Sequence, residues 1–355
     1  MNNPFPAAPL LMVGSAPYKT ADETFRTWSN SVAPHLVAIP DGEVLDRRMW
    51  VQRLYYQVYN GHPDLDVVQR PIADDGTEMP IPRTRAEAFK FKVKPSVEKV
   101  KLGLPGWRLG YAKDAINSYL LFRALRDQGL FEAGTRFQVS LPTPNSVCNP
   151  AVFDLEGLDA ARSGYLDALV AEIANICDHI PHEDLAIQLD SSWEITDVYG
   201  ETALPVADAL TRNLTQYSAI CEAVPAQVQL GVHLCFGTFG GWPRFAPSDL
   251  GEAVSLTLGI VRSSSRAMDW IHIPTLDTLD KAFYAPLARL EGIATRIYLG
   301  MIHSMESFEE RLAVARQFLP SFGIAAYCGF GRLTRAEMDG IVEDHLEALD
   351  LWKGD

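Results

Sequence analysis

The chain has 355 residues, of which 47% are hydrophobic and 21% charged. This length allows one large domain or two small ones. The formal net charge of −14 argues against nucleic acid and anionic membranes as main partners. No apolar run approaches the roughly 18 residues of a membrane span. Five scattered cysteines, and a start at residues 1–6 that lacks the basic residues of a signal peptide, lead us to expect a cytoplasmic protein.

Eight short apolar runs follow one another along the chain, and each predicts a buried strand. They cover residues 10–15, 35–43, 136–142, 185–190, 228–235, 267–274, 296–302 and 322–327. Segments with helical spacing alternate with them, at residues 46–59, 113–128, 155–177, 204–223, 249–262, 278–290, 307–318 and 334–352. This alternation predicts an α/β fold, a single parallel (β/α)₈ TIM barrel over residues 1–355. A doubly wound open sheet is the main structural alternative.

The segment 60–112 fits neither period well and is rich in proline, glycine and charge. Within it Phe89-Lys-Phe-Lys-Val-Lys94 alternates strictly, which predicts a strand with one lysine face. We interpret 60–112 as an insertion or lid after the second strand. Its lysines are either a solvated face or an anion-attracting cover over a site, and the sequence leaves both readings open.

The carboxyl ends of barrel strands meet at one opening, where such barrels keep their chemistry. The polar residues at these ends are Ser15, Glu43, Asp190, His233, Cys235, His272, His303 and Cys328. His233 and Cys235 are two residues apart on a strand, so an imidazole and a thiol share one face. Two thiols and an imidazole suit Zn²⁺, and three protein ligands leave a fourth position for a substrate. The alternative is that both thiols are buried and inert.

These motifs resemble the catalytic barrel of cobalamin-independent methionine synthase, in the superfamily that it shares with uroporphyrinogen decarboxylase. The resemblance covers nearly the whole chain except residues 60–112. It implies that His233, Cys235 and Cys328 bind zinc and that His303, in His303-Ser304, is the proton donor. It also implies a binding site for a homocysteine-like acceptor, made by Gly14 and Ser15 of Gly14-Ser15-Ala-Pro17, Glu43 of Gly42-Glu43 and Asp190 of Gln188-Leu-Asp190.

The chain also departs from the family pattern. The family's fourth zinc ligand is a Glu at the end of the sixth strand, where this chain has Ile271-His-Ile-Pro274. Proline cannot bind a metal, and His272, on the same strand face, is the candidate substitute. Ser191 replaces a carboxylate beside Asp190, and Met301 replaces the Asp that precedes the family's His-Ser.

The resemblance therefore implies a zinc-dependent methyltransferase that moves a methyl group to the thiol of a homocysteine-like acceptor, with a substrate that differs from the family's. A folate or a corrinoid protein would be the methyl donor. The second reading is a metal-independent decarboxylase or lyase of the uroporphyrinogen-decarboxylase type, in which cations such as Arg332 bind substrate carboxylates. A third reading is a binding protein without catalysis.

Overall fold

The computed structural model describes residues 8–152 and 154–354. The start of the chain, on which we based the expectation of no signal peptide, lies outside the described residues. Eight parallel strands form one sheet in the order β1-β10-β9-β8-β7-β6-β5-β2. A parallel bridge between Leu10 and Leu36 links its two edges and nearly closes the barrel. The predicted TIM barrel is confirmed, and the open-sheet alternative is excluded.

The eight barrel strands coincide with the eight predicted apolar runs. They are β1 (Leu10–Leu11), β2 (Ala38–Pro40), β5 (Arg136–Pro142), β6 (Leu185–Ser191), β7 (Gln229–Leu234), β8 (Trp270–Pro274), β9 (Arg296–Ile302) and β10 (Gly323–Ala326). Every residue of β6 and of β8 is buried, because side chains on one face fill the barrel and those on the other pack under the helices.

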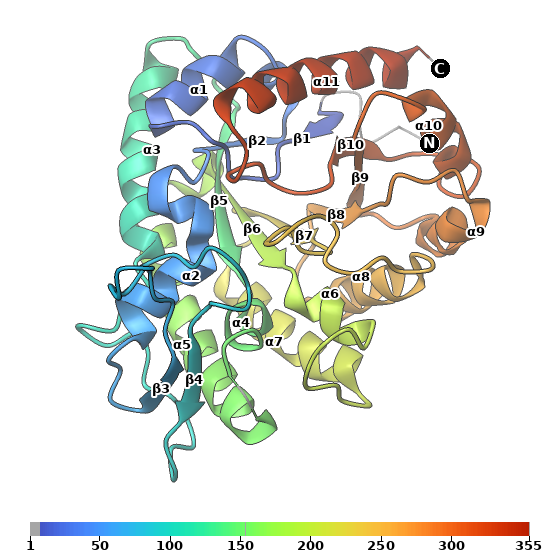
Figure 1. Ribbon diagram of the computed structural model, residues 1–355. Helices are drawn as coiled ribbons and strands as arrows, with labels where there is room; N and C mark the ends of the chain where they lie inside the picture. The colour runs from blue at the N-terminus through green and yellow to red at the C-terminus, as the bar shows by residue number, and fades with distance from the viewer. Residues whose placement is uncertain (1–7, 153, 355) are drawn as a thin grey trace.

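Helices cover the outside of the barrel (Figure 1). The longer ones are α1 (Ala21–Ser29), α3 (Tyr111–Asp127), α5 (Leu155–His179), α7 (Ala209–Ala223), α8 (Gly251–Ser263), α10 (Phe308–Arg316) and α11 (Arg335–Lys353). Shorter ones are α2 (Trp50–Leu54), α4 (Pro144–Cys148), α6 (Trp193–Val198) and α9 (Lys281–Tyr284). Among the described residues, no helix combines the length and the apolar character needed to cross a membrane.

Two predicted helices are wrong in detail, and the helices α1, α4 and α6 were missed. The predicted helix 46–59 is a composite of a 3₁₀ turn (Leu45–Met49), α2 and a π-helical turn (Tyr55–Tyr59). The predicted helix 278–290 is only the single turn of α9 followed by a 3₁₀ turn (Ala285–Leu290). The missed α1 begins after Thr20, whose hydroxyl accepts a hydrogen bond from the Glu23 amide. Such a cap satisfies a free amide of the first helical turn.

The segment 60–112 contains an antiparallel hairpin of β3 (Leu65–Gln69) and β4 (Lys90–Val93). The hairpin extends away from the barrel strands at the lower left of Figure 1, and Phe91 bridges Val152, just before α5. The predicted strand at 89–94 is therefore present, but its lysines do not share one environment. Lys92 is exposed, Lys94 lies 3.9 Å from Asp66, and Lys90 lines the pocket at the barrel mouth.

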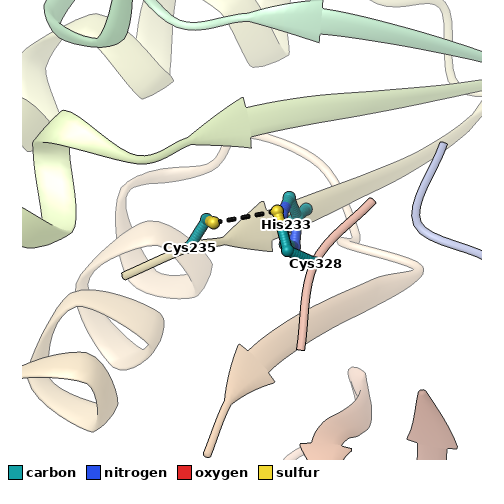
Figure 2. Close-up of side chains that lie close together, drawn as sticks. All are labelled: His233, Cys235 and Cys328. Atoms are coloured by element: carbon teal, nitrogen blue, oxygen red, sulfur yellow. Dashed lines mark hydrogen bonds between the residues drawn. The ribbon is translucent and has the colours of Figure 1, made fainter. Parts of the chain in front are cut away.

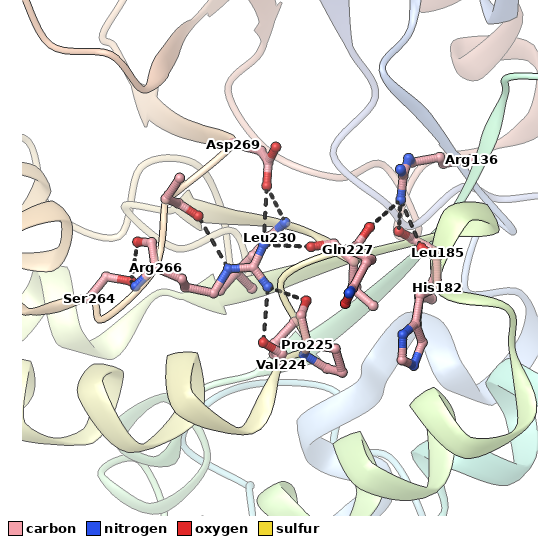
Figure 3. Close-up of polar contacts among 12 residues, drawn as sticks. Arg136, His182, Leu185, Val224, Pro225, Gln227, Leu230, Ser264, Arg266 and Asp269 are labelled. Carbon is pink, nitrogen blue, oxygen red and sulfur yellow. Dashed lines mark hydrogen bonds and ion pairs between the residues drawn. The ribbon is translucent and has the colours of Figure 1, made fainter.

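The amino-terminal end of the barrel is held together by arginines bound to backbone carbonyls (Figure 3). Arg136 Nη1 donates to the carbonyls of His182, Leu185 and Gln227 at 2.9–3.0 Å. The Arg266 guanidinium donates to three carbonyls of the segment before β7, namely Val224, Pro225 and Val228, at 2.6–3.0 Å. Each arginine thus ties neighbouring strand starts together by satisfying carbonyls that the sheet leaves free.

Candidate metal centre

The register of three neighbouring strands brings the central side chains of the site together. Asp190 on β6 pairs with His233 on β7, and His233 pairs with His272 on β8. Paired positions of parallel strands put their side chains on the same face of the sheet. The two imidazole rings accordingly have centroids 4.7 Å apart.

Cys235 and Cys328 complete a cluster with His233 (Figure 2). Cys235 follows β7 and Cys328 follows β10, so the two thiols come from strand ends 93 residues apart in sequence. One ligand atom from each of the three residues lies within 4.8 Å of the others, and the two sulfurs are 3.1 Å apart. Of the described residues, this is the one such His, Cys, Asp or Glu cluster.

The two thiols differ in how readily they lose a proton. The Cys235 thiol donates a hydrogen bond to the Cys328 sulfur, which raises the pKa of Cys235 and lowers the pKa of Cys328. The Gly237 amide also donates to the Cys235 sulfur at 3.3 Å. A thiolate is therefore favoured at Cys328, and a thiolate is the form of cysteine that binds metals.

The geometry of the cluster fits a zinc ion after a small adjustment. Tetrahedral zinc with bonds of about 2.3 Å to sulfur separates two thiolates by about 3.8 Å. The sulfurs at 3.1 Å would have to move apart by well under an ångström, which a small rotation of the two side chains allows. The donor set of one imidazole and two thiolates is one that zinc prefers.

His272 lies behind His233. Its Nε2 is 3.0 Å from the Ala326 carbonyl, and its Nδ1 is 2.7 Å from His233 Nδ1. Burial keeps the pKa of His272 well below its usual range, so the ring is neutral. Since a carbonyl can only accept, we assign the His272 proton to Nε2, which makes its Nδ1 an acceptor. His233 then donates from Nδ1 and keeps a lone pair on Nε2.

This arrangement does not support the expectation that His272 replaces the family's missing fourth ligand. Both of its ring nitrogens are engaged, and the side chain is fully buried. Gly300 on β9 makes room for it, because a Cβ there would lie 2.6 Å from His272 Nε2. Three candidate ligand side chains thus remain, and His272 contacts one of them in the way that outer partners contact metal-binding histidines.

Two buried carboxylates lie beside the cluster. Burial, together with the charge of Asp41, raises the pKa of Glu43 to about 8. Burial and the charge of Glu43 raise the pKa of Asp190 well above its usual range. Gln188 Nε2 donates to Asp190 Oδ1 at 2.9 Å and partly offsets this effect. At neutral pH the pair therefore holds a proton, and a bound ammonium group would favour ionisation of both carboxylates.

The loops after β1 and β10 close the floor of the site. Ser15 Oγ accepts from the Gly331 amide at 3.2 Å, and the Ser15 carbonyl accepts from the Phe330 amide at 2.7 Å. A Cβ at Gly14 would collide with the Glu43 carboxylate, and a Cβ at Gly329 would lie 2.5 Å from Ser15 Oγ. Glycine at 329 therefore permits the close approach of these two loops, and glycine at 14 leaves room for the Glu43 carboxylate.

The thiol cluster and the two carboxylates face one pocket of about 210 Å³ at the carboxyl end of the strands. It brings together Gly14, Ser15, Glu43, Asp190, His233, Cys235 and Cys328 of the residues that the sequence singled out. Arg332, which the sequence suggested as a substrate-binding cation, also lines the pocket. Sequence reasoning did not find Arg85 from the segment 60–112, Arg244 from the loop after β7 or Ser146 from α4, which line it as well.

His303, the expected proton donor, is separated from this pocket. Its ring stacks on Tyr327, with centroids 5.0 Å apart and planes at 5°, and Tyr327 in turn lies 4.4 Å from Trp242. Burial and the nearby Arg311 lower the pKa of His303 to about 4, so the imidazole is neutral at pH 7. His303 thus packs against Tyr327 and Trp242 and does not line the pocket. Its role as an acid remains a prediction.

Comparison with models of known protein families and with curated proteins found no match. Comparison with solved structures found the crystal structure of a protein from Listeria monocytogenes that is provisionally named a vitamin-B12 independent methionine synthase. The two chains are 14% identical, with a TM-score of 0.55, and the match covers 94% of this chain and 86% of the other. At this identity the likeness shows that the two chains share the TIM-barrel fold.

Proposed function

We propose that this protein is a zinc-dependent methyltransferase that transfers a methyl group to the thiol of a homocysteine-like acceptor. The observation that carries the proposal is the cluster of His233, Cys235 and Cys328 at the floor of a pocket on the carboxyl side of a TIM barrel. The fold shared with a protein provisionally named a methionine synthase supports the same reaction class.

His233, Cys235 and Cys328 would hold the zinc ion, with His233 kept in the correct tautomer by His272. A zinc ion there would supply a positive charge that keeps the acceptor's thiol ionised at neutral pH, and so nucleophilic. The substrate would take the position that three protein ligands leave open.

The acceptor's amino-acid part would bind beside the cluster. Glu43 and Asp190 would accept hydrogen bonds from an ammonium group, which would favour the ionised form of two carboxyl groups whose pKa values are raised mainly by burial. Ser15, with the glycine-lined loop around it, is placed to hold a carboxylate. The residues of the pocket would therefore orient the thiol and shield it from water.

A decarboxylase or lyase without metal is the second candidate, and the cations Arg85, Arg244 and Arg332 in the pocket favour it. Such cations would bind substrate carboxylates, as Arg does in general. That reaction has no use for a thiol pair 3.1 Å apart beside an imidazole, which is why we rank it second.

The test uses homocysteine as the acceptor, with 5-methyltetrahydrofolate and methylcobalamin as alternative donors. We expect thiol methylation that is abolished by a zinc chelator and restored by added zinc. Proton release when homocysteine alone is added to the zinc-loaded protein checks thiolate formation without a donor. Absence of proton release, or an activity that survives complete zinc removal, would contradict the proposal.

A further inference from the structure

Three arginines surround the outer part of the pocket. Arg85 comes from the segment 60–112, Arg244 from the loop after β7, and Arg332 from the loop after β10. They lie in a protein with a net charge of −14, so their gathering does not follow from a generally basic surface. The same pocket contains the thiols and the carboxylates described above.

Arg85 and Arg332 both contact Phe239. Arg85 Nε donates to the Phe239 carbonyl, while the Arg332 guanidinium lies 5.9 Å from the centre of the Phe239 ring and donates to the Thr238 hydroxyl. The neighbouring Gly240, at φ +87°, would place a Cβ 3.2 Å from Arg85 Nε. Glycine at this position therefore allows the segment 60–112 to close onto the loop after β7.

Arg244 is anchored on the other side of the same loop. Its Nη2 donates to the Ser192 carbonyl at 2.6 Å and to the Thr196 hydroxyl, and its guanidinium lies 4.2 Å over the Trp193 ring. A Cβ at Gly237, which has φ +83°, would lie 2.6 Å from Arg244 Nη1. Arg244 Nε is buried and has no hydrogen-bond partner among the described residues.

The hydrogen bonds that these three guanidinium groups form within the described part of the chain go to neutral carbonyl and hydroxyl oxygens. Burial and the charge of Arg332 lower the pKa of Arg85. Burial lowers the pKa of Arg244 to about 10, and the charge of Arg85 adds to the effect. Arg85 and Arg244 are thus partly buried like charges without a hydrogen-bonded carboxylate, an arrangement that an anion bound between them would stabilise.

The arginines lie next to the thiol cluster. Thr238 Oγ1 is 3.8 Å from the Cys328 sulfur and also accepts the hydrogen bond from Arg332. Only the Thr238 side chain therefore lies between Arg332 and the Cys328 thiol, so a ligand group bound by Arg332 would be close to the thiols. The carboxylates Glu43 and Asp190, which would hold an ammonium group, repel anions, so the two kinds of ligand group separate within the pocket.

We propose that Arg85, Arg244 and Arg332 form a recognition site for an oxyanion, a carboxylate or phosphate group carried by the second substrate, and that the segment 60–112 completes this site. The identity of that second substrate as the methyl donor rests on the proposed function, whereas anion binding does not. Arginine suits this task because its planar donors match the oxygens of both groups.

The test measures binding of two probes, glutarate and inorganic phosphate, to the full-length protein by calorimetry. In Arg85→Ala and Arg332→Ala we expect the dissociation constant of the preferred probe to rise at least tenfold. Arg83→Ala is the matched control, because Arg83 lies in the same segment but forms exposed ion pairs with Asp74 and Glu87. Circular dichroism on each sample checks the fold.

Tighter binding of glutarate supports a carboxylate on the second substrate, and tighter binding of phosphate supports a phosphate. Equal affinity for a probe in wild type, Arg85→Ala and Arg332→Ala, or no binding to wild type, overturns the proposal. Zinc content is measured on the same samples. Anion binding lost in the variants while wild type contains no zinc would preserve this proposal and remove the proposed function.

Discussion

The two ends of the barrel use arginine in opposite ways. At the amino-terminal end, the Arg136 and Arg266 guanidinium groups donate to carbonyls of the segments that lead into the strands (Figure 3). At the mouth, Arg85 and Arg332 each donate one hydrogen bond, to the Phe239 carbonyl and the Thr238 hydroxyl, and face a pocket.

The comparison separates groups that hold the fold from groups that are placed for a ligand. Arginines whose donors are used by backbone carbonyls stabilise the chain, since removing them leaves those carbonyls without a partner. Arginines gathered in a pocket with spare donors lower stability slightly and gain their partner on binding. This division agrees with TIM barrels in general, in which the amino-terminal face contributes to stability and the carboxyl face contains the functional site.

In the helical shell around the barrel, His345 on α11 should make the free energy of unfolding depend strongly on pH. Burial lowers the pKa of His345 to about 4, whereas the unfolded chain binds this proton near pH 6.5. The free energy of unfolding should therefore be fully present above about pH 6.5 and fall by up to about 3 kcal/mol as the pH drops to about 4. Urea unfolding across this range should show a shallower slope in His345→Leu than in wild type, where the lowered pKa values of His272 and His303 contribute in the same direction. Equal slopes in both proteins would refute the assignment.

At the amino-terminal end, Arg266→Ala should lower the free energy of unfolding by about 2–3 kcal/mol, because three carbonyls lose charged hydrogen bonds. Zinc content should not change. The matched control is Arg262→Ala, an exposed position four residues earlier, which should change stability by less than about 0.5 kcal/mol. A destabilisation of Arg266→Ala no larger than that of the control would break the comparison.

His272→Leu should weaken zinc binding by about 10- to 100-fold, because His233 loses the partner that fixes its tautomer. Competition with a chromophoric chelator measures this change. Complete loss of zinc would show that His272 is a ligand after all, and an unchanged affinity would show that the His233–His272 hydrogen bond does not support the site.

The smallest effect is expected for Arg332→Ala at the mouth. Its removal should alter the free energy of unfolding by less than about 0.5 kcal/mol, since the side chain is exposed and its one hydrogen bond goes to Thr238. Thermal unfolding without added anions measures this. A loss comparable to that of Arg266→Ala would mean that the mouth arginines are structural as well.

The sequence predicted the barrel because its signal is local and repeated. Each apolar run is long enough to make a strand that is buried on both faces, as β6 is throughout. The proximity of the His233 and Cys235 side chains was also predictable, because a two-residue spacing on a strand fixes a common face. The missed α1 had a usable signal in Thr20 and Glu23, which form a helix start.

The rest depends on contacts between distant segments, which no local pattern encodes. Arg85 reaches Phe239 across 154 residues, and nothing around Arg85 distinguishes it from the solvated Arg83. His303 follows a strand as predicted, yet its ring stacks on Tyr327 and lies outside the pocket lining. His272 looked like a ligand because its strand position is right, but its neighbours His233 and Ala326 take both nitrogens.

The most direct test of the account is elemental analysis of zinc in the purified protein and in two cysteine variants. We predict about one zinc per chain in wild type, the same amount in Cys177→Ala, whose thiol lies on α5 outside the pocket, and less than about a tenth of it in Cys235→Ser. Equal zinc in Cys235→Ser and wild type, or no zinc in wild type supplied with the metal, would contradict the account.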